Sequence, residues 1–170
     1  MSAAAMPEVA SDRFTSAPLI LGWREWVGLP GLGLPVIKAK VDTGARTSAL
    51  HAFEVTTETR GQQEIVCFSV HPLQHRGDLV VQCEAPLVDR RIVSDSGGHR
   101  EQRFVIAAEL LLADQRWLVE LTLTDRDTMR FRMLIGRTAL AGRALVDPRR
   151  SFAAGHCANP GAAYKLGKSR

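Results

Sequence analysis

Residues 35–45 are Pro-Val-Ile-Lys-Ala-Lys-Val-Asp-Thr-Gly-Ala, a run of strand-forming residues that ends in an acidic turn. A carboxylate on a rigid turn at a strand end is suited to hold or release a proton beside a water molecule. The same Asp-Thr-Gly also forms ordinary turns, in which Asp accepts hydrogen bonds from its own backbone. Asp42 is therefore a candidate catalytic residue, and the rest of the sequence must decide between the two interpretations.

The segment Leu134-Ile135-Gly136-Arg137 follows an apolar-polar alternation over residues 129–133. Alternation with a period of two is typical of a half-buried strand, because successive side chains point to opposite faces. The sequence therefore predicts a second strand that ends in glycine and arginine. Together with the turn at Asp42, this segment resembles the retropepsin pattern, in which an apolar-apolar-Gly strand packs against the catalytic Asp-Thr-Gly turn.

Two longer strings make the resemblance closer. Residues 39–52 and residues 125–137 are similar to the bacterial family labelled "ATP-dependent zinc protease", whose fold is retropepsin-like. The resemblance covers about residues 19–146. It implies an all-β fold, namely a closed retropepsin-like barrel with one short helix after the Leu-Ile-Gly strand. It also implies an aspartic endopeptidase that acts on a peptide or protein substrate.

The resemblance further implies which residues form the site. They are the catalytic Asp42, Thr43 and Gly44, the substrate-binding Ala45, Arg46, Ser96, Gly97 and Gly98, and the supporting Gly136 and Arg137. Residues 94–99 supply a glycine-rich flap in this plan, and mobile lids cover many active sites. Viral enzymes have an acid where this chain has Arg46, so Arg46 faces either substrate or solvent. Arg137 is expected to brace the turn, and Asp125 or Asp127 could pair with one of the two arginines.

Water activation in this class uses two carboxylates. Two carboxylates a few ångströms apart cannot both ionise at neutral pH, so they share one proton and act as base and acid. Because the chain has one credible Asp-Thr-Gly, we expect a homodimer that brings Asp42 against its copy. The alternative partner is Asp95 of the same chain, although a Gly-Gly hairpin tip explains the segment Asp95-Ser96-Gly97-Gly98 without catalysis.

Neither part of the family label has support in the residues. A zinc protease of the zincin type needs His-Glu-x-x-His, an ATPase needs Gly-x-x-x-x-Gly-Lys-Ser/Thr, and the chain has neither string. A zinc site can be drawn from the spacings of Cys67, His71, His75 and Cys83. A strand followed by a loop with Pro72 does not bring those four side chains to one point. We therefore expect no metal and no organic cofactor.

The chain has 170 residues, of which 45% are apolar, enough for one well-buried core and too few for two. We expect a domain over residues 19–147, a flexible N-terminal arm over 1–18 and a C-terminal surface tail over 148–170. Strands are predicted over 19–29, 33–41, 47–53, 64–70, 78–88, 103–112, 117–124 and 129–135, with a turn over 56–61 and a helix over 138–141.

Charge and composition narrow the class of partner. The net charge is +4, but the arginines are dispersed and only 6% of residues are aromatic, so we expect no nucleic-acid partner. No apolar stretch approaches the roughly 20 residues of a membrane span. Residues 1–18 lack the basic start and apolar core of a secretory signal, and three cysteines cannot all pair internally. A cytoplasmic protein is expected.

Two functions from different classes remain open. The first is an aspartic endopeptidase in which paired Asp42 carboxylates activate water. The second is a non-catalytic domain that keeps the groove and flap to hold a peptide or partner protein. Relatives in the resembled family are often associated with glutamate ligases, so a link to glutamylated proteins is conceivable for the second.

Overall fold

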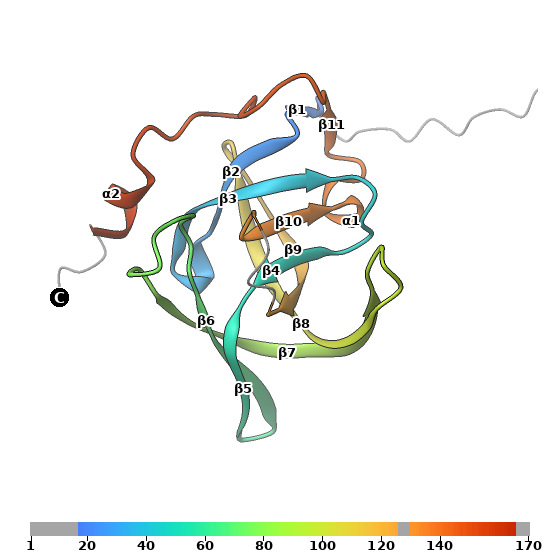
Figure 1. Cartoon of the computed structure of the whole chain (residues 1–170), viewed down its shortest axis with the longest axis vertical. Helices are drawn as coiled ribbons and strands as arrows, with labels where there is room; N and C mark the ends of the chain where they lie inside the picture. The colour runs from blue at the N-terminus through green and yellow to red at the C-terminus, as the bar shows by residue number, and fades with distance from the viewer. Residues whose placement is uncertain (1–16, 126–129, 166–170) are drawn as a thin grey trace, which may run out of the picture.

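In the computed structural model, which describes residues 17–125 and 130–165, the chain is built mainly from β-strands (Figure 1). The strands are β1 (Leu19–Leu21), β2 (Arg24–Leu29), β3 (Leu34–Asp42), β4 (Ser48–His51), β5 (Phe53–Arg60), β6 (Gln63–Val70), β7 (Val81–Ser94), β8 (Arg100–Leu112), β9 (Gln115–Thr124), β10 (Met133–Gly136) and β11 (Ala144–Val146). The helices are the 3-10 turn η1 (Pro30–Leu32), α1 (Arg137–Leu140) and α2 (Pro160–Lys165). The prediction of a mostly β fold with a short helix directly after the Leu-Ile-Gly strand is confirmed.

Nine strands form one sheet in the order β2-β3-β10-β4-β9-β8-β7-β6-β5, and β1 and β11 form a separate parallel pair. β10 lies between β3 and β4, parallel to the first and antiparallel to the second. β4 in turn runs parallel to β9. These parallel pairings join segments far apart in the sequence, and they place the ends of β3 and β10 side by side.

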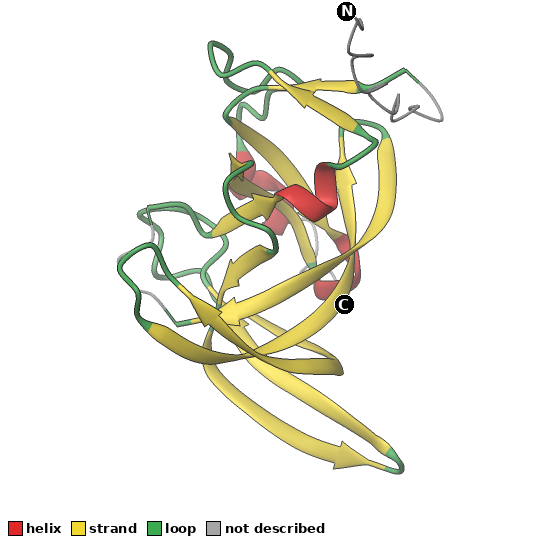
Figure 2. Ribbon diagram, turned by 90° about the vertical axis from the view of Figure 1, so that its right-hand side faces the viewer, coloured by secondary structure: helices red, strands yellow, loops and turns green. Residues whose placement is uncertain are grey.

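The expectation of a closed barrel is wrong. The sheet curls until Gly28 of β2 pairs with Leu111 of β8, which is the single pair joining those strands. β7, β6 and β5 lie beyond this contact in the strand order. β7 and β8 are 14 and 13 residues long, and β6 and then β5 pair onto the far edge of β7, so the sheet does not end where β2 meets β8. Figure 2 shows the β5–β6 hairpin extending away from the rest of the molecule.

Alternation along the strands separates the core from the outer face. In β3, Ile37, Ala39 and Val41 are buried, whereas Lys38 and Lys40 point to the opposite face. Asp42 is two positions after Lys40 along β3, so its side chain points to the same face as the two lysines. It therefore ends β3 on the outer face, beside the space that the long β7–β8 hairpin also borders.

Two further expectations need correction. The turn predicted over residues 56–61 is largely strand, since β5 extends to Arg60 and the chain turns at Gly61, whose φ is +62°. The segment predicted as a tail carries α2 and is attached to the sheet: Phe152 stacks on Trp26, and the Tyr164 hydroxyl donates to the Val36 carbonyl. Among the described residues, no helix has the length and apolar character needed to cross a membrane.

Candidate active site

The turn after β3 holds the Asp42 carboxylate with its own backbone. Oδ1 of Asp42 accepts hydrogen bonds from the backbone N–H groups of Gly44, at 3.1 Å, and Ala45, at 3.3 Å. The Asp42 side chain is half-buried, while Thr43 and Gly44 are exposed. The carboxylate is therefore fixed in direction and remains accessible from the surface.

Gly136 allows β10 and the start of β4 to meet behind this turn. Gly136 pairs with Asp42 in the parallel ladder, and its N–H donates to the Ser48 hydroxyl at 3.0 Å. A Cβ at position 136 would lie 2.5 Å from the Thr47 carbonyl carbon and 2.7 Å from its oxygen. Only glycine fits this approach, because the opposing atoms belong to the backbone and cannot rotate away.

The start of α1 fastens the other side of the turn. Backbone N–H groups of Arg137 and Thr138 donate to the carbonyls of Ala45 and Arg46 at 2.7 and 3.0 Å. The guanidinium of Arg137 donates to the Thr43 carbonyl at 3.0 Å and more weakly to that of Gly44 at 3.4 Å. The Asp-Thr-Gly-Ala turn is thus held by residues more than ninety positions away in the sequence.

The β7–β8 hairpin reaches the same region, as its tip and the turn after β3 lie on one side of Figure 1. A cavity of about 610 Å³ lies between them, lined by Asp42, Ala45 and Arg46 from the turn and by Ser94, Asp95 and Ser96 from the hairpin. Of the three flap residues expected to bind substrate, Ser96 lines this cavity and Gly97 and Gly98 do not.

Asp95 shares the cavity with Asp42, yet its carboxylate stabilises its own hairpin turn. Oδ1 of Asp95 accepts from the N–H groups of Gly97 and His99, both at 2.9 Å. Gly98 closes the turn with a φ of +80°. The segment Asp95-Ser96-Gly97-Gly98 therefore forms a tight hairpin tip, as its turn residues predict.

Arg103 is a cavity residue that the sequence reasoning missed. It lies on β8, is 8% exposed, and its Nε donates to Glu101 at 3.0 Å. Its inward direction follows from alternation along β8, which also buries Val105. An arginine on the buried face of a predicted strand was the signal that could have identified it.

A second hollow continues from the first. It has a volume of about 730 Å³, shares Arg46 and Val93 with the Asp42 cavity, and has Ile92 and Leu118 on its rim. These two side chains are 63% and 71% exposed. The two hollows therefore adjoin at Arg46 and Val93.

The four residues considered for zinc do not gather. Cys83 is in the core, where burial raises the pKa of its thiol to about 12. Cys67 is the register partner of Glu84 in the β6–β7 ladder, so its side chain points to the opposite face of the sheet. Nδ1 of His71 lies 3.1 Å from the Leu79 carbonyl oxygen, and its ring stacks on Phe53. Across residues 17–125 and 130–165, no three His, Cys, Asp or Glu side chains are grouped to hold a metal ion.

Arg46 is exposed at the mouth of the cavity. Asp125 is also exposed, at the end of β9, and no ion pair with Arg46 or Arg137 is found for it among the described residues. Asp127 lies outside those residues, so its expected pairing stays a prediction.

The chain as a whole is similar to known proteins. A family model described as "RimB-like: Retropepsin-like aspartic endopeptidase RimB" matches residues 20–156. The chain is also similar to a crystal structure of protein Lpg0085 from Legionella pneumophila, described as having unknown function. That similarity has a TM-score of 0.68 and 26% identity, and it covers 80% of this chain and 98% of the other.

Curated relatives of the chain are named "Probable alpha-L-glutamate ligase". The chain is 48% identical over 137 residues to the protein from Parasynechococcus marenigrum, 46% over 136 residues to that from Shewanella pealeana, and 44% over 156 residues to that from Desulfotalea psychrophila. These alignments cover 81%, 80% and 91% of this chain but 29%, 30% and 34% of the relatives. The chain therefore spans about a third of the length of the curated relatives it matches.

Proposed function

This chain belongs to the RimB-like family of retropepsin-like aspartic endopeptidases, and from that membership we propose that it hydrolyses peptide bonds with water activated at Asp42. One observation carries the proposal. The Asp42 carboxylate is held at a strand end by two backbone N–H groups and lines a cavity that the β7–β8 hairpin also lines. A positioned but accessible carboxylate beside a substrate-sized groove is what acid–base catalysis on a peptide requires.

The chemistry needs a second carboxylate that shares one proton with Asp42. The ionised member takes a proton from water as the water oxygen attacks the scissile carbonyl carbon. The protonated member donates to the developing oxyanion. In the second half, the carbon–nitrogen bond breaks as a carboxyl proton passes to the leaving nitrogen. The other carboxylate takes a proton from one hydroxyl of the intermediate, which gives the product acid and leaves the pair sharing one proton again. No metal is needed in this scheme.

We further propose that Asp42 of a second copy is the partner. The exposure of Thr43 and Gly44 supports this, because a two-fold axis beside the turn would meet no covering element of the described chain. Asp95 lines the same cavity and is the alternative partner within the chain, which the mixing experiment below separates from a shared site. The unbridged cysteines Cys67, Cys83 and Cys157 are compatible with action in a reducing, cytoplasmic compartment.

The test is cleavage of an unfolded protein by the wild type, by Asp42→Asn and by their mixtures. Activity per chain is expected to rise with concentration until the dimer saturates. Excess Asp42→Asn should inhibit beyond simple dilution, because mixed dimers have one carboxylate and one amide. Equal cleavage by wild type and Asp42→Asn would refute the catalytic role, and activity from a strict monomer would refute the shared site.

A second candidate has its own observation. The chain matches about a third of the length of each relative named "Probable alpha-L-glutamate ligase". A similar domain therefore occurs as part of longer chains with that name. In this alternative the groove holds a partner protein, for example a glutamylated one, without cleaving it. Saturable binding of a glutamylated peptide with no cleavage by the wild type, and equal binding by Asp42→Asn, would favour it.

A further inference from the structure

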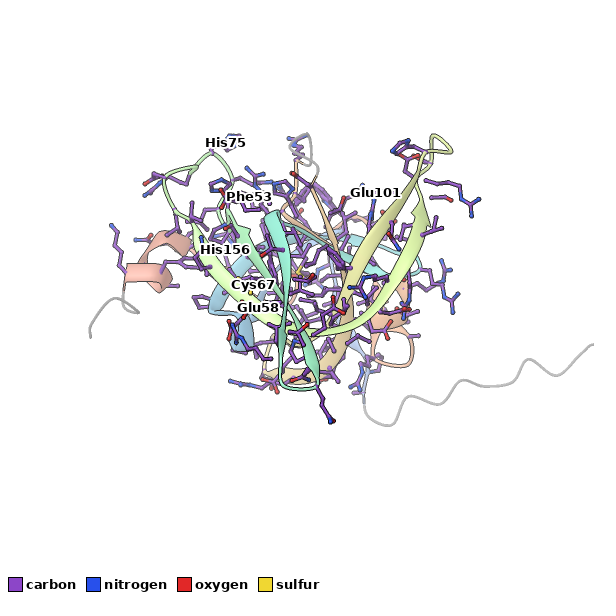
Figure 3. All side chains as sticks on the ribbon, turned by 90° about the horizontal axis from the view of Figure 1, so that it is seen from below. Phe53, Glu58, Cys67, His75, Glu101 and His156 are labelled. Carbon is purple, nitrogen blue, oxygen red and sulfur yellow. The ribbon has the colours of Figure 1, made fainter. Side chains whose placement is uncertain are left out.

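A separate hollow lies beside the middle of β3, on its outer face. It has a volume of about 460 Å³ and is formed by Trp26, Lys38, residues 72–76 and residues 157–161, none of which lines the Asp42 cavity. Lys38 precedes Asp42 by four strand positions, or about 13 Å along β3. Figure 3 shows His75 of this hollow and Glu101 of the flap hairpin on opposite sides of one face of the molecule.

The ammonium group of Lys38 is held in position at this hollow. Lys38 pairs with Trp26 across the β2–β3 ladder, and its Nζ lies 5.3 Å from the Trp26 ring centroid. The same Nζ donates to Oε1 of Gln74 at 2.9 Å. The Gln74 amide is itself fixed, because its nitrogen donates to the Arg130 carbonyl. Two direct partners, Trp26 and Gln74, thus hold a side chain that is normally flexible.

The described lining of the hollow includes basic side chains and no acidic one. The basic side chains are Lys38, His75 and Arg76. Arg76 is already paired with Asp78, which leaves Lys38 as the cation available to a ligand. Burial, followed by the charges of Arg24 and Arg130, lowers the pKa of Lys38. An anion bound at Nζ would offset each of these effects.

The rest of the lining suits a small apolar body. Trp26, Pro72, Leu73 and Pro160 supply apolar surface, and Asn159 adds an amide. His75 has a φ of +61°, a left-handed conformation that costs free energy in a non-glycine residue and often accompanies binding sites. The volume of about 460 Å³ lies in the range of sites that hold small organic molecules and is too small for a folded partner.

We propose that this hollow binds a small organic anion, with a carboxylate or phosphate group on Lys38 and an apolar part against Trp26 and Leu73. The site is independent of peptide cleavage at Asp42. The competing explanation is that Lys38 simply ties the loop of residues 72–76 to the sheet through Gln74. That role needs no ligand, so a binding experiment separates the two.

The probes are benzoate and phenyl phosphate, with neutral benzamide and inorganic phosphate as comparison compounds. Binding is followed by the NMR signal of the Trp26 indole N–H, which Trp26→Phe identifies. We expect a saturable shift with benzoate or phenyl phosphate and affinity about tenfold weaker for benzamide, because the charged contact is lost. Inorganic phosphate should also bind about tenfold more weakly, since it lacks the apolar part.

Lys38→Met is the decisive variant, because it keeps the apolar stem and removes the charge. It should weaken benzoate binding about tenfold or more. Lys40→Met is the matched control on the same face of β3, outside the hollow, and should change affinity less than about twofold. Three results would each overturn the proposal: no saturable shift with either anion, equal binding of benzamide, or equal losses in the two lysine variants. Retained thermal stability of Lys38→Met, together with lost binding, excludes the purely structural role.

Discussion

Two turns of this molecule have nearly the same sequence and the same local chemistry, and they differ in what holds them from outside. Asp42-Thr43-Gly44 ends β3, and Asp95-Ser96-Gly97 forms the tip of the β7–β8 hairpin. In each turn Oδ1 of the aspartate accepts two backbone N–H groups that follow it in the sequence. Both turns border one cavity.

The turn at Asp42 is clamped by distant parts of the chain. Gly136 packs against Thr47, Arg137 donates to Thr43, and Thr138 donates to Arg46 through both its backbone and its hydroxyl. At the other turn, hydrogen bonds between residues 95 and 99 of the hairpin hold the loop, and Asp95 has a further interaction beside them. An Asp-Ser/Thr-Gly string therefore specifies a turn, and tertiary contacts decide whether that turn is a rigid platform.

The largest expected difference between the turns is in peptide hydrolysis. Asp42→Asn should lower the rate at least about a thousandfold, because the amide cannot exchange the shared proton. Asp95→Asn should keep the rate within about threefold, since the amide oxygen still accepts both N–H groups. Rates measured on one fluorogenic peptide decide this. A loss with Asp95→Asn as large as that with Asp42→Asn would make Asp95 the second carboxylate and end the distinction.

Gly136→Ala tests the clamp itself. The new Cβ would overlap the Thr47 carbonyl, so we expect a loss of about 3 kcal/mol in the free energy of unfolding, or failure to fold. Gly97→Ala is the control at the other turn, where the nearest atom to a new Cβ is Asp95 Oδ1 at 3.4 Å. Its effect should stay within about 0.5 kcal/mol. Urea denaturation of both variants gives the numbers, and similar losses would show that the two turns are equally constrained.

Arg137→Lys probes the side-chain part of the clamp. Lysine keeps the charge but cannot reproduce the reach of the guanidinium to two carbonyls, and we expect a loss of about 1 kcal/mol. Arg46→Lys, at an exposed position beside the same turn, should be neutral within about 0.5 kcal/mol. Amide hydrogen exchange of Ala45 should accelerate in Arg137→Lys alone. Unchanged exchange there would mean that the backbone bonds of α1 suffice.

Replacing Gly44 and Gly97 by alanine should have the smallest effects, and equal ones. A Cβ would lie 3.3 Å from Asp42 Oδ1 in the first turn and 3.4 Å from Asp95 Oδ1 in the second. Neither glycine has a positive φ, so the tight contact is offset by reduced freedom of the unfolded chain, and each change should be below about 0.5 kcal/mol. Thermal denaturation would expose any difference. A clear gap between the two would mean that the turns differ locally as well.

Local features of this protein were predictable from the sequence. The strand that ends at Asp42 and the hairpin with a Gly-Gly tip follow from side-chain alternation and turn residues, which act over a few positions. The strand predicted over 129–135 is shorter in the structure: residues 130–132 are bends, and β10 begins at Met133. The polar residues of β5 misled the prediction over 56–61, because a strand exposed on both faces has no apolar alternation to reveal it. α2 was missed for a related reason, since none of its residues is buried.

Long-range arrangement was decided only in the tertiary structure. The parallel pairing of Gly136 with Asp42, the reach of Arg137 to Thr43, and the presence of Arg103 in the cavity all depend on which strands become neighbours. The open sheet depends on how far β7 and β8 extend before the curl brings β2 to Leu111. Sequence patterns report the faces and ends of single strands, whereas strand order is set by how the whole chain buries its apolar faces at once. For that reason the eleven residues 35–45 suffice to identify the catalytic candidate, whereas the residues that surround it are identified only in the tertiary structure.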